Sequence, residues 1–484
     1  SGGNYNVTVG DEAGTAITTG DNNVAVGYGA LVANTTGTLN VAVGSLALDA
    51  NQTGSASTAV GYGAGSAFTA DGLTAFGKDA LELCTTGINT AVGANALATV
   101  TNSGGNTAMG SDALTVNTAA NNTAVGTSAL RANTTGANNT AVGFQAGLAL
   151  TVGTENVVLG DRALTTDTKG SKSIAIGQGA LNGQNFTSAT DVYNTAVGAK
   201  AGLSVTTGVN NTLIGGLAGD AITDADENVA VGMNALATNT LGSSSVAIGH
   251  QALFNQNYTS ATNAYNVAVG KNAGVAVTTG VANTLIGGLT GDAIQAGNQN
   301  TFIGYNLATS GVNVENQIAI GVAGTAGATS TARFVIGSNT ATLGIDGSDS
   351  SWAPASSDER LKENIETSTA GLSFIKDLRP VTYNWKKKKD VASDIPHYYE
   401  EGSDEPVLGY VYGRKLHGFI AQEVKTAIDN NSSDLADGFK FHQQADHGMQ
   451  TVADGNLIPM LTKAVQELST ALDAALARIA TLEG

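Results

Sequence analysis

Residues 89–96 read Asn-Thr-Ala-Val-Gly-Ala-Asn-Ala, and close copies of this phrase fill the chain as far as about residue 350. Most neighbouring copies are 16 or 17 residues apart. The recurrent glycines are Gly10, Gly27, Gly44, Gly61, Gly77, Gly93, Gly110, Gly126, Gly143, Gly160, Gly177, Gly198, Gly215, Gly232, Gly249, Gly270, Gly287, Gly304, Gly321 and Gly337. A fixed period of this length is typical of a stacked repeat architecture, in which each copy is one structural unit.

Each place in the repeat predicts a structural role. Val92 precedes the glycine, and a β-branched residue flanked by small ones suits a short strand, so we expect it to point into a narrow core. Gly93 permits a turn with positive φ or a close approach of two backbones. Ala96 marks a second inward position, and Asn89 suits a hydrogen bond at the corner or stacking on its equivalents in neighbouring copies.

The repeat predicts a parallel β-solenoid with one coil per copy. Helical repeats do not tolerate this glycine, threonine and asparagine content, and collagen requires glycine at every third residue. At a strand spacing of roughly 4.8 Å, about twenty coils form a rod about 90–100 Å long. A core of alanine and valine buries little apolar area, so we expect three chains to associate and bury one more face of every coil.

Two steps, from Gly177 to Gly198 and from Gly249 to Gly270, are 21 residues long. Both carry nearly the same insert, and a block of about 72 residues is duplicated. The aromatic residues of these longer coils are candidates for surface contacts or for packing against a neighbouring chain: Phe186, Tyr193, Tyr258 and Tyr265.

The phrases Ser-Ile-Ala-Ile-Gly at 173–177 and Ser-Val-Ala-Ile-Gly at 245–249 resemble the head repeats of trimeric autotransporter adhesins. This resemblance covers about 70 per cent of the chain. It implies a left-handed parallel β-roll, three of which pack into a trimer. The coils here are two or three residues longer than the usual adhesin coil.

Composition changes near residue 350. All five prolines and both tryptophans follow this point, and residues 351–484 have the charged fraction of an ordinary globular domain. We therefore expect a β-solenoid shaft over 1–350 and a second domain over 351–484. The net charge of −18 argues against a nucleic-acid partner, and no apolar run is long enough to insert into a membrane. The chain begins at Ser1 rather than methionine, which is typical of a fragment or a processed chain.

The second domain contains four ordered motifs. The first is Ser-Asp-Glu-Arg-Leu-Lys-Glu-Asn-Ile at 357–365, the second Leu-Arg-Pro-Val-Thr-Tyr-Asn-Trp at 378–385, and the third His-Gly-Phe-Ile-Ala-Gln-Glu-Val at 417–424. A closing helix is expected from Leu457. Together they resemble the intramolecular chaperone domain of endosialidase-type tailspikes and other phage fibres. The resemblance implies an α+β domain that drives the assembly of three chains and is then released by autoproteolysis.

Carried over to this chain, the resemblance makes Ser357 the nucleophile and Lys362 the general base, with Asp358 as a possible orienting residue. A lysine whose pKa is lowered by burial can accept a serine proton. Residues five apart on a helix point about 140° from each other. Ser357 therefore precedes the helix, or Lys362 comes from a neighbouring subunit. The alternative is purely structural, because Ser356 and Glu359 have capping-box spacing and Asp358 suits a helix N-terminus.

The closing helix carries a heptad pattern of apolar residues, which predicts a coiled coil with the same helix of sister chains. These residues are Leu461, Val465, Leu468, Leu472, Ala475, Ile479 and Leu482. The lysine run 386–389 is expected to be a solvated loop between strands. No cofactor or metal site is expected, since His442 and His447 lack ligand spacing.

These observations favour a structural subunit of a phage tail fibre, located in the virion tail and made in the host cytoplasm. Its expected partners are two further copies of the chain, a host cell-surface receptor and other tail proteins. Self-cleavage is the only enzymatic activity expected. A bacterial trimeric surface adhesin is the first alternative, although a C-terminal membrane barrel is not evident in the sequence. A polysaccharide-degrading tailspike is the second, but the acidic residues of the shaft show no recurrent pair.

Overall fold

The computed structural model describes residues 3–308, 311–325, 331–336, 339–344, 353–354, 371–384, 386–391, 401–404, 415–431, 442–444, 450–452 and 457–483. The chain divides into two compact units, Ser1–Ser356 and Ser357–Gly484. Among the described helices, none combines the length and the hydropathy needed to cross a bilayer.

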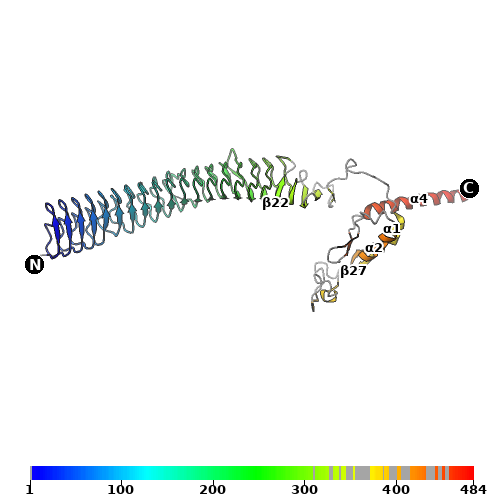
Figure 1. The fold of residues 1–484 in the computed structure, drawn as a ribbon. Helices are drawn as coiled ribbons and strands as arrows, with labels where there is room; N and C mark the ends of the chain where they lie inside the picture. Colours follow the sequence, from blue (N-terminus) through cyan, green and yellow to red (C-terminus); the bar gives the residue numbers. More distant parts are fainter. Residues whose placement is uncertain are drawn as a thin grey trace. The chain divides into compact units, whose positions relative to one another are not determined.

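The first unit is a parallel β-solenoid, as predicted, with about 18 turns between residues 7 and 322. Figure 1 shows its coils stacked in a single row from the N-terminus (blue) to β22 (green). Neighbouring strands pair one repeat apart, so that Ala25 lies opposite Ala42 and Val26 opposite Val43. The strands that pair one repeat apart are β1 (Val7–Val9), β2 (Val24–Val26), β3 (Val41–Val43), β4 (Thr58–Val60), β5 (Thr74–Phe76), β6 (Thr90–Val92), β7 (Thr107–Met109), β8 (Thr123–Val125), β9 (Thr140–Val142), β10 (Val157–Leu159), β12 (Ile174–Ile176), β14 (Thr195–Val197), β15 (Thr212–Ile214), β16 (Val229–Val231), β18 (Val246–Ile248), β20 (Val267–Val269), β21 (Thr284–Ile286), β22 (Thr301–Ala308) and β23 (Ile318–Thr325).

The direction of the strand side chains differs from the expectation. Counting from the recurrent glycine as position 0, the residue at −1 was expected to point inward, but the buried residue is the alanine at −2. In β6, Ala91 is fully buried while Val92 is exposed. Because side chains alternate along a strand, an inward alanine turns both of its neighbours outward. The column of residues at −1, many of them β-branched, therefore lies on the outer face.

The glycine at position 0 serves both predicted purposes. Gly143 has φ +138°, and a Cβ on it would lie 2.5 Å from the carbonyl oxygen of Gly160 in the next coil. Any side chain here would meet the neighbouring backbone, which cannot move aside because it is held by the sheet. The recurrence of glycine therefore follows from the close stacking of coils.

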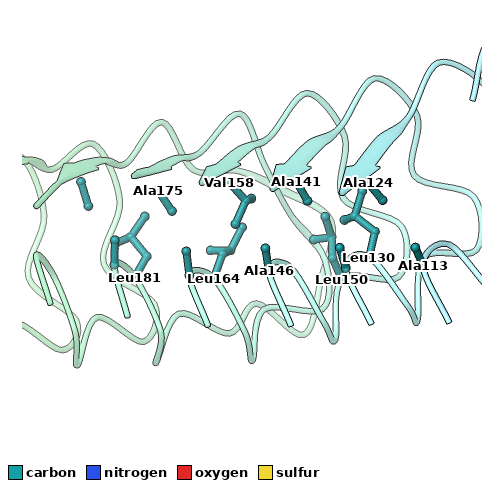
Figure 2. Close-up of a cluster of buried hydrophobic side chains, with 14 of the residues drawn as sticks. Ala113, Ala124, Leu130, Ala141, Ala146, Leu150, Val158, Leu164, Ala175 and Leu181 are labelled. Atoms are coloured by element: carbon teal, nitrogen blue, oxygen red, sulfur yellow. The ribbon is translucent and has the colours of Figure 1, made fainter. Parts of the chain in front are cut away.

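The core is filled by positions −2, +3, +4 and +7, several of which Figure 2 shows pointing between the strands and the opposite turns. Position +3 is a buried alanine, such as Ala146, as predicted. In most coils position +4 is leucine or glycine, and position +7 is usually polar after leucine and apolar after glycine. Leu130 is followed by Asn133, whereas Gly147 is followed by Leu150. A Cβ on Gly147 would lie 2.9 Å from Cδ2 of Leu130, so a glycine in one coil makes room for side chains of its neighbours.

The asparagines at position −4 form a buried ladder, which confirms that they stack on their equivalents. The backbone N–H of Asn156 donates to Oδ1 of Asn139 at 3.0 Å, and its side-chain amide donates to the carbonyl oxygen of Gly170 at 3.0 Å. The same bonds recur along the shaft, for example from Asn300 to Asn283. Each buried amide is therefore satisfied by the next coil, as buried polar groups require.

The two 21-residue coils each add a second short parallel pair, β11 (Gly170–Ser171) with β13 (Thr190–Asp191), and β17 (Gly242–Ser243) with β19 (Thr262–Asn263). Two of the four aromatic residues expected at the surface, Phe186 and Tyr258, are instead buried at 6 % exposure. Tyr258 donates its hydroxyl hydrogen to the carbonyl oxygen of Gly280 at 2.7 Å. The extra residues thus fold over the core, and only Tyr193 and Tyr265 remain exposed.

The regular register ends at the last coils of the shaft. β24 (Thr331–Ile336) is parallel to β23 but places Val335 opposite Gly321, a shorter step than the repeat predicts. Gly337 lies outside the described residues. β25 (Asn339–Gly344) then pairs antiparallel with β24, and β26 (Ala353–Pro354) pairs antiparallel with β25.

The second unit is a small α/β region that ends in a long helix. Its elements are α1 (Leu372–Asp377), β27 (Val381–Tyr383), the 3₁₀ helix η2 (Lys388–Asp390), β28 (Leu416–Gly418), α2 (Ala421–Asn430), β29 (His442–Gln444), β30 (Gln450–Val452) and α4 (Ile458–Glu483). β27 pairs antiparallel with β28, and β29 with β30.

Candidate functional site

The residues expected to carry out cleavage, Ser357, Asp358 and Lys362, lie outside the described residues. Their roles therefore remain predictions. The second and third motifs and the closing helix are largely described, and they form the structure that follows the cleavage motif in the chain.

The second and third motifs meet in one small sheet and one ion pair. Thr382 of β27 lies opposite His417 of β28. Arg379, just before β27, binds the carboxylate of Glu423 in the first turn of α2, with Nε donating to Oε2 at 3.0 Å. This bond lowers the pKa of Glu423 and raises that of Arg379. Both side chains are well exposed, so the pair specifies how the motifs align more than it stabilises them.

A compact apolar core joins α1, α2 and the start of α4. Its buried members are Phe374, Leu378, Val424, Ala427, Ile428 and Leu457, with Ile375, Phe419 and Met460 packed at the edge. Phe374 is fully buried at its centre. Leu378 and Val424 belong to the quoted motifs, whereas no motif indicated that Phe374 would be the largest buried side chain of this core.

Polar contacts join the ends of the same helices. The side-chain amide of Asn431, after α2, donates to Oδ2 of Asp377 at the end of α1. At the other end of α1, the backbone N–H of Leu372 donates to Oε2 of Glu467 on α4 at 2.8 Å. Sequence reasoning missed both contacts, because their partners are far apart in the chain and no spacing links them.

The lysine run lies between β27 and β28 and is exposed or half-buried, as expected of a solvated loop. It is also anchored, because Lys387 and Lys389 bind Oδ1 of Asp404 at 2.7 and 2.6 Å. These bonds lower the pKa of Asp404 to about 2. Asp404 therefore stays ionised at neutral pH and holds the run to its own chain.

Helix α4 confirms the predicted C-terminal helix and exposes an apolar stripe. The heptad residues Leu461, Val465, Leu468, Leu472, Ile479 and Leu482 are each at least 43 % exposed. Leu457, just before α4, and Met460 in its first turn pack on the domain core, and Ala464 is also buried. An apolar stripe at heptad spacing is typical of a helix that associates with other helices.

A second apolar stripe follows the outer face of the shaft sheet. It consists of the position −1 residues that the fold turns outward. Besides Val9 in the first coil, which is 56 % exposed, nine members are 36 to 45 % exposed: Phe76, Val92, Met109, Val142, Leu159, Ile214, Ile248, Ile286 and Ile303. Long contiguous apolar surfaces of this kind usually mark an interaction site.

One family model matches the chain, over residues 357–432, and it is described as the chaperone of endosialidase. No curated protein and no solved structure shows significant similarity to the chain. The match begins at the predicted nucleophile and includes the second and third motifs. The chain therefore carries a C-terminal chaperone domain of the endosialidase type after a β-solenoid.

Proposed function

We propose that this chain is a subunit of a trimeric phage tail fibre, in which the shaft supports host attachment and the chaperone domain directs assembly and is then cut off. The observation that carries the proposal is the coincidence at one residue: the family match begins at 357, and the second compact unit begins at Ser357. A chain break there would separate shaft from chaperone without cutting through either.

The proposed cleavage uses Ser357 and Lys362. Lys362 accepts the hydroxyl proton of Ser357, whose Oγ attacks a neighbouring peptide carbonyl. The C–N bond then breaks, the amine leaves with a proton, and water hydrolyses the ester. Endosialidase-type chaperones are released in this way, and the reaction requires no cofactor.

Two surfaces support the proposed trimer. The outer sheet face of the shaft and the heptad stripe of α4 both expose apolar side chains that association would remove from water. We expect both stripes to face sister chains. The remaining shaft surface would then be available to a host receptor and to other tail proteins of the virion.

A denaturing gel of the purified full chain tests the cleavage. We expect two bands, of about 350 and 130 residues by the position of Ser357, from the wild type, and one full-length band from Ser357→Ala or Lys362→Ala. A wild-type trimer that stays intact would contradict the cleavage. If light scattering shows that the wild-type protein is a monomer, the proposed trimeric fibre is contradicted.

A further inference from the structure

Each of the two long coils carries a small platform on the side of the shaft. In the first platform β11 pairs with β13, and in the second β17 pairs with β19. Phe186 and Tyr258 are buried and anchor the two inserts in the shaft. The backbone N–H of Phe186 also donates to Oδ1 of Asp167 at 3.1 Å. Both inserts are therefore held firmly to the shaft.

Each platform ends in an exposed tyrosine. Val192 and Ala264 are fully buried, and the residues that follow them, Tyr193 and Tyr265, are 53 and 60 % exposed. Tyr193 lies just before β14, and Tyr265 lies just before β20. These strands are four coils apart in the same ladder, through β15, β16 and β18. At the usual strand spacing, the two tyrosines therefore lie roughly 19 Å apart along one side of the shaft.

The backbone conformation of both tyrosines is unfavourable for a bulky residue. Tyr193 has φ +53° and Tyr265 has φ +49°. Asparagine adopts positive φ much more readily than tyrosine does. Asn210, at the equivalent place in the coil after Tyr193, has φ +58°. Because asparagine would serve the fold better, two exposed tyrosines at this place indicate a role outside the coil.

Polar groups lie beside each tyrosine. Nζ of Lys172 lies 5.2 Å from the ring centroid of Tyr193 and donates to its hydroxyl oxygen at 3.1 Å. The same Nζ binds Oδ2 of Asp191 at 2.7 Å. In the second platform, Ser244 and Asn263 take the places of Lys172 and Asp191. An aromatic ring with hydrogen-bonding groups beside it suits a sugar, which has an apolar ring face and hydroxyl groups around its edge.

We infer that the two platforms bind one linear polysaccharide along the shaft, with one sugar ring stacked on Tyr193 and another on Tyr265. Two sites on a rigid rod favour a polymer that reaches both of them. Lys172 is already paired with Asp191, and the net charge of the chain is −18, so a strongly acidic polymer fits poorly. The ligand class is therefore a neutral polysaccharide. The inference names the class of receptor for the proposed host attachment and so rests on that proposal.

The test measures binding by the assembled full chain. The probes are purified neutral and acidic polysaccharides from bacterial surfaces, and titration calorimetry gives the Kd of each. Tyr193→Asn and Tyr265→Asn remove the rings but keep a residue suited to positive φ. Tyr28→Asn is the matched control, because Tyr28 is also an exposed tyrosine, at 51 %, but belongs to an ordinary coil. Light scattering and thermal unfolding check the assembly and the fold of each variant.

We expect the wild type to bind at least one neutral polysaccharide. Each single platform variant should bind it roughly three- to tenfold more weakly, the size of one lost ring contact, and the double variant more weakly still. A fragment of the same polymer that is too short to reach both platforms should bind the wild type more weakly than the polymer does. Tyr28→Asn should match the wild type, and no platform variant should have a lower Tm.

Unchanged binding in the double variant would overturn the inference. Loss of trimers or a lower Tm in the platform variants would also overturn it, because the rings would then pack within the fibre. A wild type that adsorbs to the bacterial cells but binds none of the polysaccharides purified from them would contradict the inference and leave host attachment standing. Failure to adsorb to the cells as well would contradict the proposed attachment too.

Discussion

The shaft is stabilised by contacts between adjacent coils, whereas the chaperone domain is stabilised by contacts between residues far apart in the sequence. In the shaft, the asparagines at position −4 and the glycines at position 0 contact their equivalents one coil away. In the chaperone domain, the decisive contacts join residues far apart, such as Arg379 with Glu423 and Leu372 with Glu467. A solenoid coil cannot bury its own face and gains stability only from neighbours that are already formed. The chaperone domain has a core of its own and does not depend on repeated neighbours in this way.

The largest effect is expected at the core of the chaperone domain. Phe374→Ala should destabilise this domain by about 3–5 kcal/mol, because it leaves a cavity where α1, α2 and α4 meet. If the domain directs assembly, light scattering should show fewer trimers although no shaft residue has changed. Phe374→Leu is the milder control. Normal shaft assembly in an unfolded Phe374→Ala domain would show that the shaft folds unaided.

The next effect separates two adjacent glycines of the shaft. Gly215 has φ +133°, and a Cβ on it would lie 2.7 Å from the carbonyl oxygen of Gly232, whereas the nearest atom to a Cβ on Gly216 is 3.9 Å away. Gly215→Ala should cost about 3 kcal/mol through backbone strain and contact. Gly216→Ala should be nearly neutral. Thermal unfolding measures both, and equal effects would refute the close-stacking explanation.

A double-mutant cycle tests the compensation between positions +4 and +7. Gly147→Leu alone overfills the core, and Leu150→Asn alone leaves space and a polar group in it. Together they recreate the pair found at Leu130 and Asn133. The double variant should therefore be more stable than the sum of the single effects, by about 1–3 kcal/mol. Simple additivity in denaturant unfolding would mean that the two positions are independent.

The smallest effect is expected at the surface of the chaperone domain. Asp404 has a folded pKa of about 2, below its ordinary value, because Lys387 and Lys389 bind it. Any stability from these bonds is present above pH of about 4, the ordinary carboxyl pKa, and is lost as the pH falls towards 2. Asp404→Asn should leave the Tm at neutral pH almost unchanged, since the groups are exposed. NMR titration of the Asp404 carboxyl carbon checks the pKa, and a midpoint near 4 would contradict the ion pairs.

Sequence reasoning worked best where one local rule repeats. The period, the glycine column, the buried alanine at +3 and the asparagine ladder all followed from the spacing of Gly93 and its equivalents. It failed where the sequence pattern did not decide whether a side chain points into the core or towards solvent. Val92 suited a strand core by type, yet the inward side chain of its strand is Ala91, and Val92 points outward. Phe186 and Tyr258 suited the surface because they stand in inserts, yet the inserts fold over the core.

The amino-acid sequence by itself determined a repetitive shaft followed by a chaperone domain, because both are encoded by patterns that repeat or occur in order along the chain. The tertiary structure alone decided which strand face is inside, since a three-residue strand alternates in the same way whichever face is buried. It also decided which remote residues meet. Arg379 with Glu423, and Leu372 with Glu467, are contacts made by packing around Phe374, and spacing along the chain carries no record of them.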